Sequence, residues 1–195
     1  GEFAVSLPPS PEDDRFHITV KTVGKVTGAL HSLQAGDKLG VRGPFGNGFP
    51  FEEIKGKNVV YVAGGIGLIP LRSSIVNVLQ HREDFGRIIL MYGSRSPDDL
   101  MYSYNLEEWQ NIDGFETFIT VDNPTPDWKG HSGIITTLFD KMELPVDDTV
   151  AFVCGPPIMF NAVIKEVMDR GISDEHIIST LERHMKCGVG KCQHC

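Results

Sequence analysis

Short apolar runs alternate with segments of helical apolar spacing along residues 58–169. The runs have the length and flanking turns of buried strands, and apolar residues between them recur every three or four positions, as on the buried face of a helix. The predicted strands are 58–62, 87–92, 115–121 and 149–154. The predicted helices are 68–80, 101–109, 133–141 and 158–169. This alternation favours a Rossmann-like parallel sheet with helices on both faces.

The order of these elements also predicts where a ligand would bind. Connections between parallel strands are almost always right-handed, so the carboxyl ends of all the strands meet at one edge of the sheet. Ligands of open α/β sheets bind along that edge. We therefore expect functional residues directly after each strand.

The first 50 residues have a different pattern, with strand-like runs at 3–7 and 16–23 separated by a Pro-rich turn. A short helix is predicted over 27–33 and a strand over 38–42, followed by a Gly/Pro-rich loop. We expect three segments: residues 1–50, residues 51–180 and residues 181–195.

Composition narrows the function classes. The formal charge of −8, without a long Lys/Arg run, gives nucleic-acid binding little support. No apolar stretch approaches the roughly 18 residues of a membrane span. Three of the four cysteines lie within the last nine residues, which favours metal ligation over disulfides and a reducing compartment, the cytoplasm.

The strongest nucleotide signal is the strand-to-helix turn that contains Ala63, Gly64, Gly65, Ile66 and Gly67. Glycines let the backbone approach a pyrophosphate, and the following helix offers free N–H groups. Pro70 suits the first turn of that helix. An ordinary tight turn would use the same residues, because the pattern is G-G-x-G rather than G-x-G-x-x-G.

Two other strand ends carry candidate nucleotide contacts. Cys154, Gly155 and Pro156 form a second glycine turn, where Cys154 would lie beside a ligand or simply fill the core as a small apolar residue. Ser94 and Arg95 are candidates for holding an adenosine ribose or its 2′-phosphate, although a solvated loop has the same composition. NAD and NADP therefore both remain open.

Gly24 and Thr27 precede the short helix of the first segment. Thr27 is a candidate N-cap, and both residues could face a phosphate; a plain capped helix is the alternative.

Cys187, Cys192 and Cys195 have the spacing C-x4-C-x2-C, which opens a plant-type [2Fe–2S] site. Such a cluster takes four thiolates, and the fourth usually follows. Zinc bound by the same cysteines, in a regulatory module without turnover, is the alternative from another class.

Together these motifs resemble the ferredoxin–NADP reductase superfamily, in the branch with a cluster C-terminal to the nicotinamide domain. The loop Gly43-Pro-Phe-Gly46, the glycine turns and the cysteine spacing carry the resemblance in the family's order. It implies a flavin-binding β-barrel, an NAD(P)-binding α/β domain and a short iron–sulfur segment. The chain is expected to be an internal part of a longer protein, beginning midway through the barrel.

The resemblance also implies cofactors and roles. FAD would be held by Ser6, Gly24, Val26 and Thr27, with Ser6 matching the serine of the family's flavin motif and Cys154 beside the nicotinamide. Electrons would pass between NAD(P)H, FAD, a [2Fe–2S] cluster and a catalytic redox subunit of hydrogenase, sulfite reductase or dihydroorotate dehydrogenase type. A hydrogenase gamma-like subunit is the favoured interpretation. A stand-alone flavin or oxygenase reductase is the alternative.

Overall fold

The computed structural model describes residues 16–41, 47–180, 187 and 191–193, together with the backbone of residues 3–6. The chain divides into two compact units. One comprises Phe51–Thr180, and the other comprises Gly1–Pro50 with Leu181–Cys195. The predicted loop at residues 43–46 and most of the segment after residue 180 lie outside the described residues.

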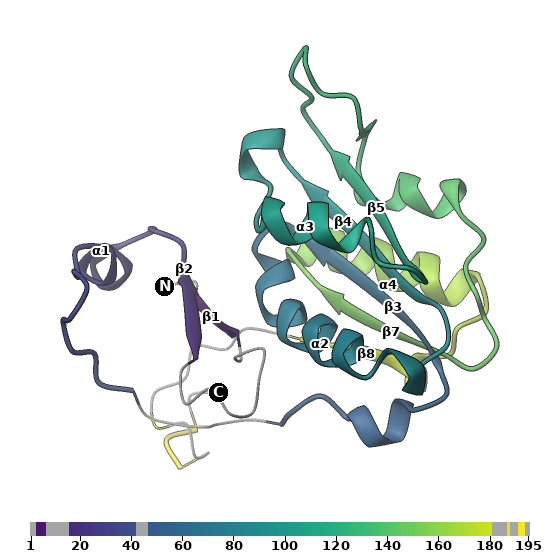
Figure 1. Cartoon of the computed structure of the whole chain (residues 1–195), viewed down its shortest axis with the longest axis horizontal. Helices are drawn as coiled ribbons and strands as arrows, with labels where there is room; N and C mark the ends of the chain where they lie inside the picture. The colour runs from purple at the N-terminus through teal and green to yellow at the C-terminus, as the bar shows by residue number, and fades with distance from the viewer. Residues whose placement is uncertain (1–2, 7–15, 42–46, 181–186, 188–190, 194–195) are drawn as a thin grey trace. The chain divides into compact units, whose positions relative to one another are not determined.

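The larger unit is built on a six-stranded, wholly parallel sheet with the order β6-β5-β4-β3-β7-β8 (Figure 1). Its strands are β3 (Asn58–Gly64), β4 (Ile88–Ser94), β5 (Phe115–Val121), β6 (His131–Ser132), β7 (Thr149–Cys154) and β8 (Ile177–Ser179). The central strands are buried on both faces, which explains their unbroken apolar sequence.

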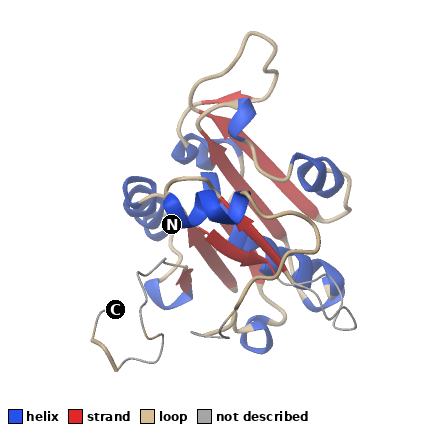
Figure 2. Ribbon diagram, turned by 90° about the vertical axis from the view of Figure 1, so that its left-hand side faces the viewer, coloured by secondary structure: helices blue, strands red, loops and turns tan. Residues whose placement is uncertain are grey.

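Helices cover both faces of this sheet (Figures 1 and 2). On one face lies α2 (Leu68–Gln80), joined to β3 by a 2.9 Å hydrogen bond between the hydroxyls of Tyr61 and Ser74. The opposite face packs against α4 (Pro157–Asp169) and the 3-10 helix η5 (Ile135–Lys141). The core between that face and those helices includes Val60, Val62, Ile89, Met91, Ala151, Val153, Leu138, Phe139, Val163 and Val167.

The remaining helical elements are short. α3 (Ser103–Trp109) follows β4, and single 3-10 turns connect other elements. These turns are η1 (Phe51–Ile54), η2 (Gly65–Gly67), η3 (Arg82–Asp84), η4 (Pro97–Asp99) and η6 (Asp174–His176). No described helix is both long and apolar enough to cross a bilayer.

The smaller unit contains an antiparallel pair, β1 (Phe3–Ser6) and β2 (His17–Val20), and the helix α1 (Lys25–His31). Their register joins Phe3 to Val20 and Ser6 to His17. The predicted strand at 38–42 is wrong where the structure describes it, because residues 38–41 are irregular. Both apolar side chains of this segment, Leu39 and Val41, are exposed, so no buried face favours a strand there.

Two further corrections concern helices. The segment predicted as a helix over 133–141 is the 3-10 helix η5. α1 begins two residues earlier than predicted, with Gly24 rather than Thr27 at the N-cap. The short strands β6 and β8 were not predicted, while α2, β5 and β7 have the predicted bounds.

Candidate functional site at the carboxyl edge of the sheet

The strand order reverses between β3 and β7, and this is where the two glycine turns meet. From β3 the chain adds β4, β5 and β6 on one side, then returns to place β7 and β8 on the other. A crevice outside the carboxyl ends of the strands forms at such a reversal, and nucleotides bind there in open α/β sheets. The turns at residues 64–67 and 154–157 flank this point.

Gly67 is required because the two turns are packed together. A Cβ added at Gly67 would overlap the carbonyl oxygen of Cys154 and lie 2.9 Å from the backbone nitrogen of Gly155. The obstacle is backbone and cannot rotate away. At Gly64 and Gly155 the added carbon would instead meet the side chain of Met159. The three glycines therefore allow the β3 and β7 turns to touch.

Gly65 serves a different purpose. Its φ is +53°, a left-handed conformation that favours glycine, and a Cβ there would meet no atom within 4 Å. Space above the backbone is thus open at the start of α2, where the helix presents its N–H groups. This is the arrangement in which backbone can approach a pyrophosphate.

The side chain of Tyr92 fixes the Gly65 turn by hydrogen bonds. Its hydroxyl donates to the carbonyl oxygen of Gly65 at 3.3 Å and accepts from the backbone N–H of Met101 at 3.1 Å. Burial raises the pKa of Tyr92 to about 12. The phenol therefore stays protonated at physiological pH and fixes the turn as a neutral donor.

The end of β4 presents a buried hydroxyl without a well-formed hydrogen bond to the described residues. Ser94 is 5% exposed, and its side chain lies near enough to the Tyr92 hydroxyl to lower the pKa of Tyr92 slightly against the larger effect of burial. Ser94 Oγ forms no hydrogen bond of good geometry with any described residue, and the nearby Tyr92 hydroxyl already bonds to Gly65 and Met101. Next to it, the exposed Arg95 makes no ion pair with any residue that the structure describes. Both side chains are available to a ligand.

A cluster around Tyr102 was not identified from the sequence. Tyr102 has φ +54°, a strained conformation for a residue with a side chain, and such strain concentrates at functional sites. The Arg72 guanidinium lies over its ring at 4.9 Å and donates to Asn105 Oδ1 at 2.8 Å. Tyr104 meets the ring edge-on at 6.1 Å. In the sequence, only the position of Tyr102 after the β4 strand end could have suggested a role at this edge.

In the smaller unit, Thr27 shapes the start of α1 rather than capping it. Its buried hydroxyl accepts from the N–H groups of Val23 and Gly24, both at 2.9 Å, and donates to the Gly24 carbonyl at 3.1 Å. All of its hydrogen-bonding capacity is used. In the first turn of α1, the backbone N–H groups of Lys25, Val26 and Thr27 lack intrahelical partners.

Two of the three predicted cluster cysteines lie in the described part of the chain. The backbone N–H of Cys192 donates to Cys187 Sγ at 3.4 Å. Cys195 and the side chain of Ser6 lie outside the described residues. Among described residues no group of three His, Cys, Asp or Glu side chains is placed to hold a metal.

Comparison with known proteins agrees with this placement. Residues 61–165 match the family described as the oxidoreductase NAD-binding domain. The chain is 38% identical to the sulfhydrogenase 2 gamma subunit of Pyrococcus furiosus, covering all of this chain and 72% of that protein. It is 34% identical to the probable dihydroorotate dehydrogenase B (NAD(+)) electron transfer subunit of that organism, again over all of this chain and 72% of the relative.

A solved structure, the NADH-dependent reduced ferredoxin-NADP oxidoreductase, aligns with a TM-score of 0.73 at 27% identity, over 95% of this chain and 62% of that one. The fold, the glycine turns at the strand reversal and these matches agree. The chain therefore belongs to the ferredoxin–NADP reductase-like oxidoreductases, and its larger unit is one of their NAD-binding domains.

Proposed function

We propose that this chain is an electron-transfer subunit that passes electrons between NAD(P)H, a bound FAD and a [2Fe–2S] cluster, to or from a catalytic redox subunit. The two Pyrococcus relatives support this, since their names describe subunits of a sulfhydrogenase and of a dihydroorotate dehydrogenase. The higher identity to the former supports a hydrogenase gamma-like role. A cytoplasmic location is part of the same proposal.

One observation carries the nucleotide part of this proposal. The carboxyl edge combines open backbone at Gly65 with a buried hydroxyl at Ser94, one strand away, that forms no good hydrogen bond with the described residues. A buried hydroxyl without a partner is costly, and a ligand that supplies one removes the cost. A phosphate over Gly65 and a ribose at Ser94 satisfy both features at once.

The proposed contacts follow the strand order. The pyrophosphate would lie at the start of α2, against the turn formed by Ala63, Gly64, Gly65, Ile66 and Gly67. Pro70 lies in the first turn of that helix, where a backbone N–H has no intrahelical partner to lose. Ser94 and Arg95 hold the adenosine ribose, and the Arg95 guanidinium, which pairs with no described acidic residue, favours a 2′-phosphate and hence NADPH. The turn formed by Cys154, Gly155 and Pro156 lies beside the nicotinamide end of the dinucleotide.

The residues of the smaller unit fit a flavin and a cluster, as far as they are described. Thr27 preorganises the α1 turn, so the N–H groups of Val26 and Thr27, beside Gly24, can meet a pyrophosphate. Ser6 is proposed near the flavin ring. Cys187, Cys192 and Cys195 would hold the cluster, and the N–H of Cys192 on Cys187 is a sulfur hydrogen bond of the kind that tunes such centres. Bound flavin supplies the conversion between two-electron and one-electron transfer.

The full-length protein, purified from its source without oxygen, tests this proposal. We expect flavin, inorganic sulfide and a co-purifying redox subunit. Cys192→Ser should remove the visible absorption of the cluster while flavin reduction by NAD(P)H continues. A native protein with neither flavin nor sulfide, or one that holds zinc, would refute the proposal.

A further inference from the structure

A second buried hydroxyl without a partner lies at the same edge, at the end of β8. Thr180 Oγ1 is buried and forms no hydrogen bond with any described residue. The pairing of β7 with β8 joins Val153 to Ser179, and the N–H of Thr180 continues it by donating to the Val153 carbonyl at 3.1 Å. The next step of this register places Thr180 beside Cys154.

We propose that the Thr180 hydroxyl binds the carboxamide of the nicotinamide ring, an inference that rests on the proposed function. The carboxamide is the only group on the ring that both donates and accepts hydrogen bonds. A hydroxyl also does both. Thr180 is therefore a nicotinamide-positioning residue at the end of the crevice marked by Cys154.

The positions of the two hydroxyls support this orientation of the dinucleotide. In the order β4-β3-β7-β8, Ser94 and Thr180 end strands that are three spacings apart, about 14 Å at the usual distance between strands. Gly65 lies between them, after β3. An extended dinucleotide therefore reaches a hydroxyl at each end, with its pyrophosphate over the open glycine.

Both hydroxyls also lie on one face of the sheet. Register joins Tyr92 to Ala63 and Ala63 to Cys154, and Thr180 continues that row. Ser94 is two residues beyond Tyr92 and so returns to the same face. A ligand on that side of the edge can meet both.

Thr117 supplies a matched control. Its Oγ1 is likewise buried and without a partner among the described residues. However, Thr117 pairs with Leu90 in the interior of the sheet, four residues before the Val121 that pairs with Ser94. If an orphaned hydroxyl were only a packing defect, the two threonines would behave alike.

The experiment compares Thr180→Val, Thr180→Ser and Thr117→Val in the full-length protein. Dissociation constants are measured for NADP⁺ and NAD⁺, and for ADP-ribose, which lacks the nicotinamide. We expect Thr180→Val to weaken binding of both dinucleotides about tenfold, as for loss of one buried hydrogen bond, and to leave ADP-ribose binding unchanged. Thr180→Ser should bind like wild type, and Thr117→Val should change no affinity.

The melting temperature separates ligand binding from folding. Replacing an unpartnered buried hydroxyl by a methyl group should not lower it in either valine variant. Dinucleotide binding unchanged in Thr180→Val, or an equal loss for ADP-ribose, overturns the inference while the proposed function stands. A wild-type protein that binds no dinucleotide overturns both. If the valine variant does not fold, Thr180→Ala is judged by the same affinities.

Discussion

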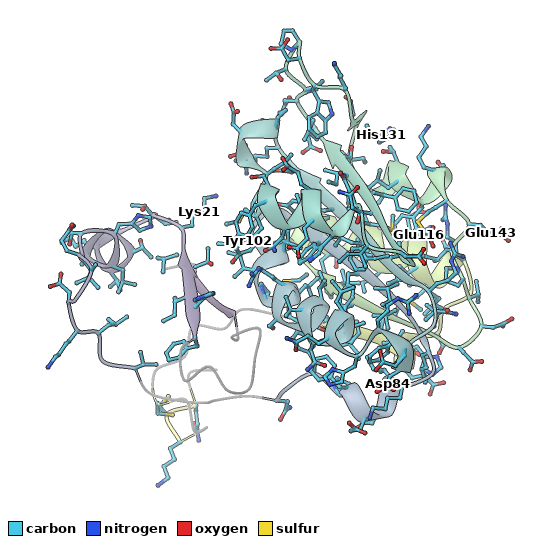
Figure 3. All side chains as sticks on the ribbon, in the orientation of Figure 1. Lys21, Asp84, Tyr102, Glu116, His131 and Glu143 are labelled. Atoms are coloured by element: carbon cyan, nitrogen blue, oxygen red, sulfur yellow. The ribbon has the colours of Figure 1, made fainter. Side chains whose placement is uncertain are left out.

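The two edges of the parallel sheet use their polar groups in opposite ways. At the amino edge, where the strands begin, side chains bond to one another and to nearby backbone. At the carboxyl edge, the buried hydroxyls of Ser94 and Thr180 lack well-formed hydrogen bonds to the described residues, and the backbone at Gly65 is open. Figure 3 shows Glu116 and Glu143, near the amino edge, on the side of the larger unit opposite Tyr102.

Asn58 illustrates the amino edge. Its side chain accepts from the N–H of Arg87 at 2.8 Å and donates to the Asp147 carbonyl at 3.1 Å and to Thr149 Oγ1 at 3.4 Å, joining the starts of β3, β4 and β7. Among the described residues there, Arg82 differs: its Nε has no partner, although its other two nitrogens donate to the carbonyls of Phe85 and Gly114.

The difference separates two kinds of residue. Amino-edge groups that bond to the protein should affect stability without affecting binding. Carboxyl-edge groups left unpartnered should affect binding without affecting stability. Each prediction below tests that division, beginning with the largest expected effect.

Gly67→Ala would break the division, because Gly67 lies at the carboxyl edge yet acts through packing. The added carbon meets the Cys154 backbone, so β3 and β7 must separate, at a cost on the order of 3 kcal/mol or more. Urea unfolding measures this. Gly65→Ala is the control: with open space around it, only the left-handed strain of about 1–2 kcal/mol applies. Equal losses in the two variants would contradict the packing argument.

Asn58→Ala tests the amino edge directly. It removes three hydrogen bonds and leaves the Arg87 N–H unpaired, so the free energy of unfolding should fall by roughly 2–4 kcal/mol. The dissociation constant for NADP⁺, measured on the folded variant, should not change. A weaker affinity would show that the two edges are coupled.

Long apolar runs made much of this architecture predictable. α2, β5 and β7 have the predicted bounds because burial of their side chains determines both the pattern and the element. β8 has only three residues and depends on pairing with β7, so no local pattern marks it. The edge that holds the site follows from strand order, whereas the unpartnered hydroxyl of Thr180 and the contact between Gly67 and Cys154 depend on packing between distant segments.

Tyr92 sharpens the comparison as a carboxyl-edge group that is fully bonded. Its pKa is raised from 10.0 to about 12 by burial, so folding opposes ionisation. Below pH 10 Tyr92 is protonated in both the folded and the unfolded chain, so the raised pKa does not change the free energy of unfolding. Between pH 10 and about 12 the unfolded chain ionises first, and the free energy of unfolding should fall by roughly 2–3 kcal/mol. Urea titrations at increasing pH measure the loss. Tyr92→Phe should reduce this slope, while the buried Tyr61 keeps its own contribution.

Arg87→Met should have the smallest effect. Arg87 forms a two-point ion pair with Glu116 at 2.9 and 3.1 Å, but its side chain is 44% exposed. Exposed pairs contribute about 0–1 kcal/mol and weaken with salt. Thermal melts at low and high salt should show a small difference that shrinks as salt rises. A loss as large as that of Asn58→Ala would mean that this charge pair anchors the edge.

The reversal between β3 and β7 also determines when the crevice can exist. Asn58 and Thr149, which start the two strands, are 91 residues apart in the chain. A polypeptide leaving the ribosome completes β3, β4 and β5 long before β7 can dock, and closing so long a loop is entropically costly. Nucleotide that binds between the two turns stabilises only molecules whose last strands are in place. The ligand therefore selects finished molecules over partly assembled ones, and its abundance in the cell would influence the yield of mature protein.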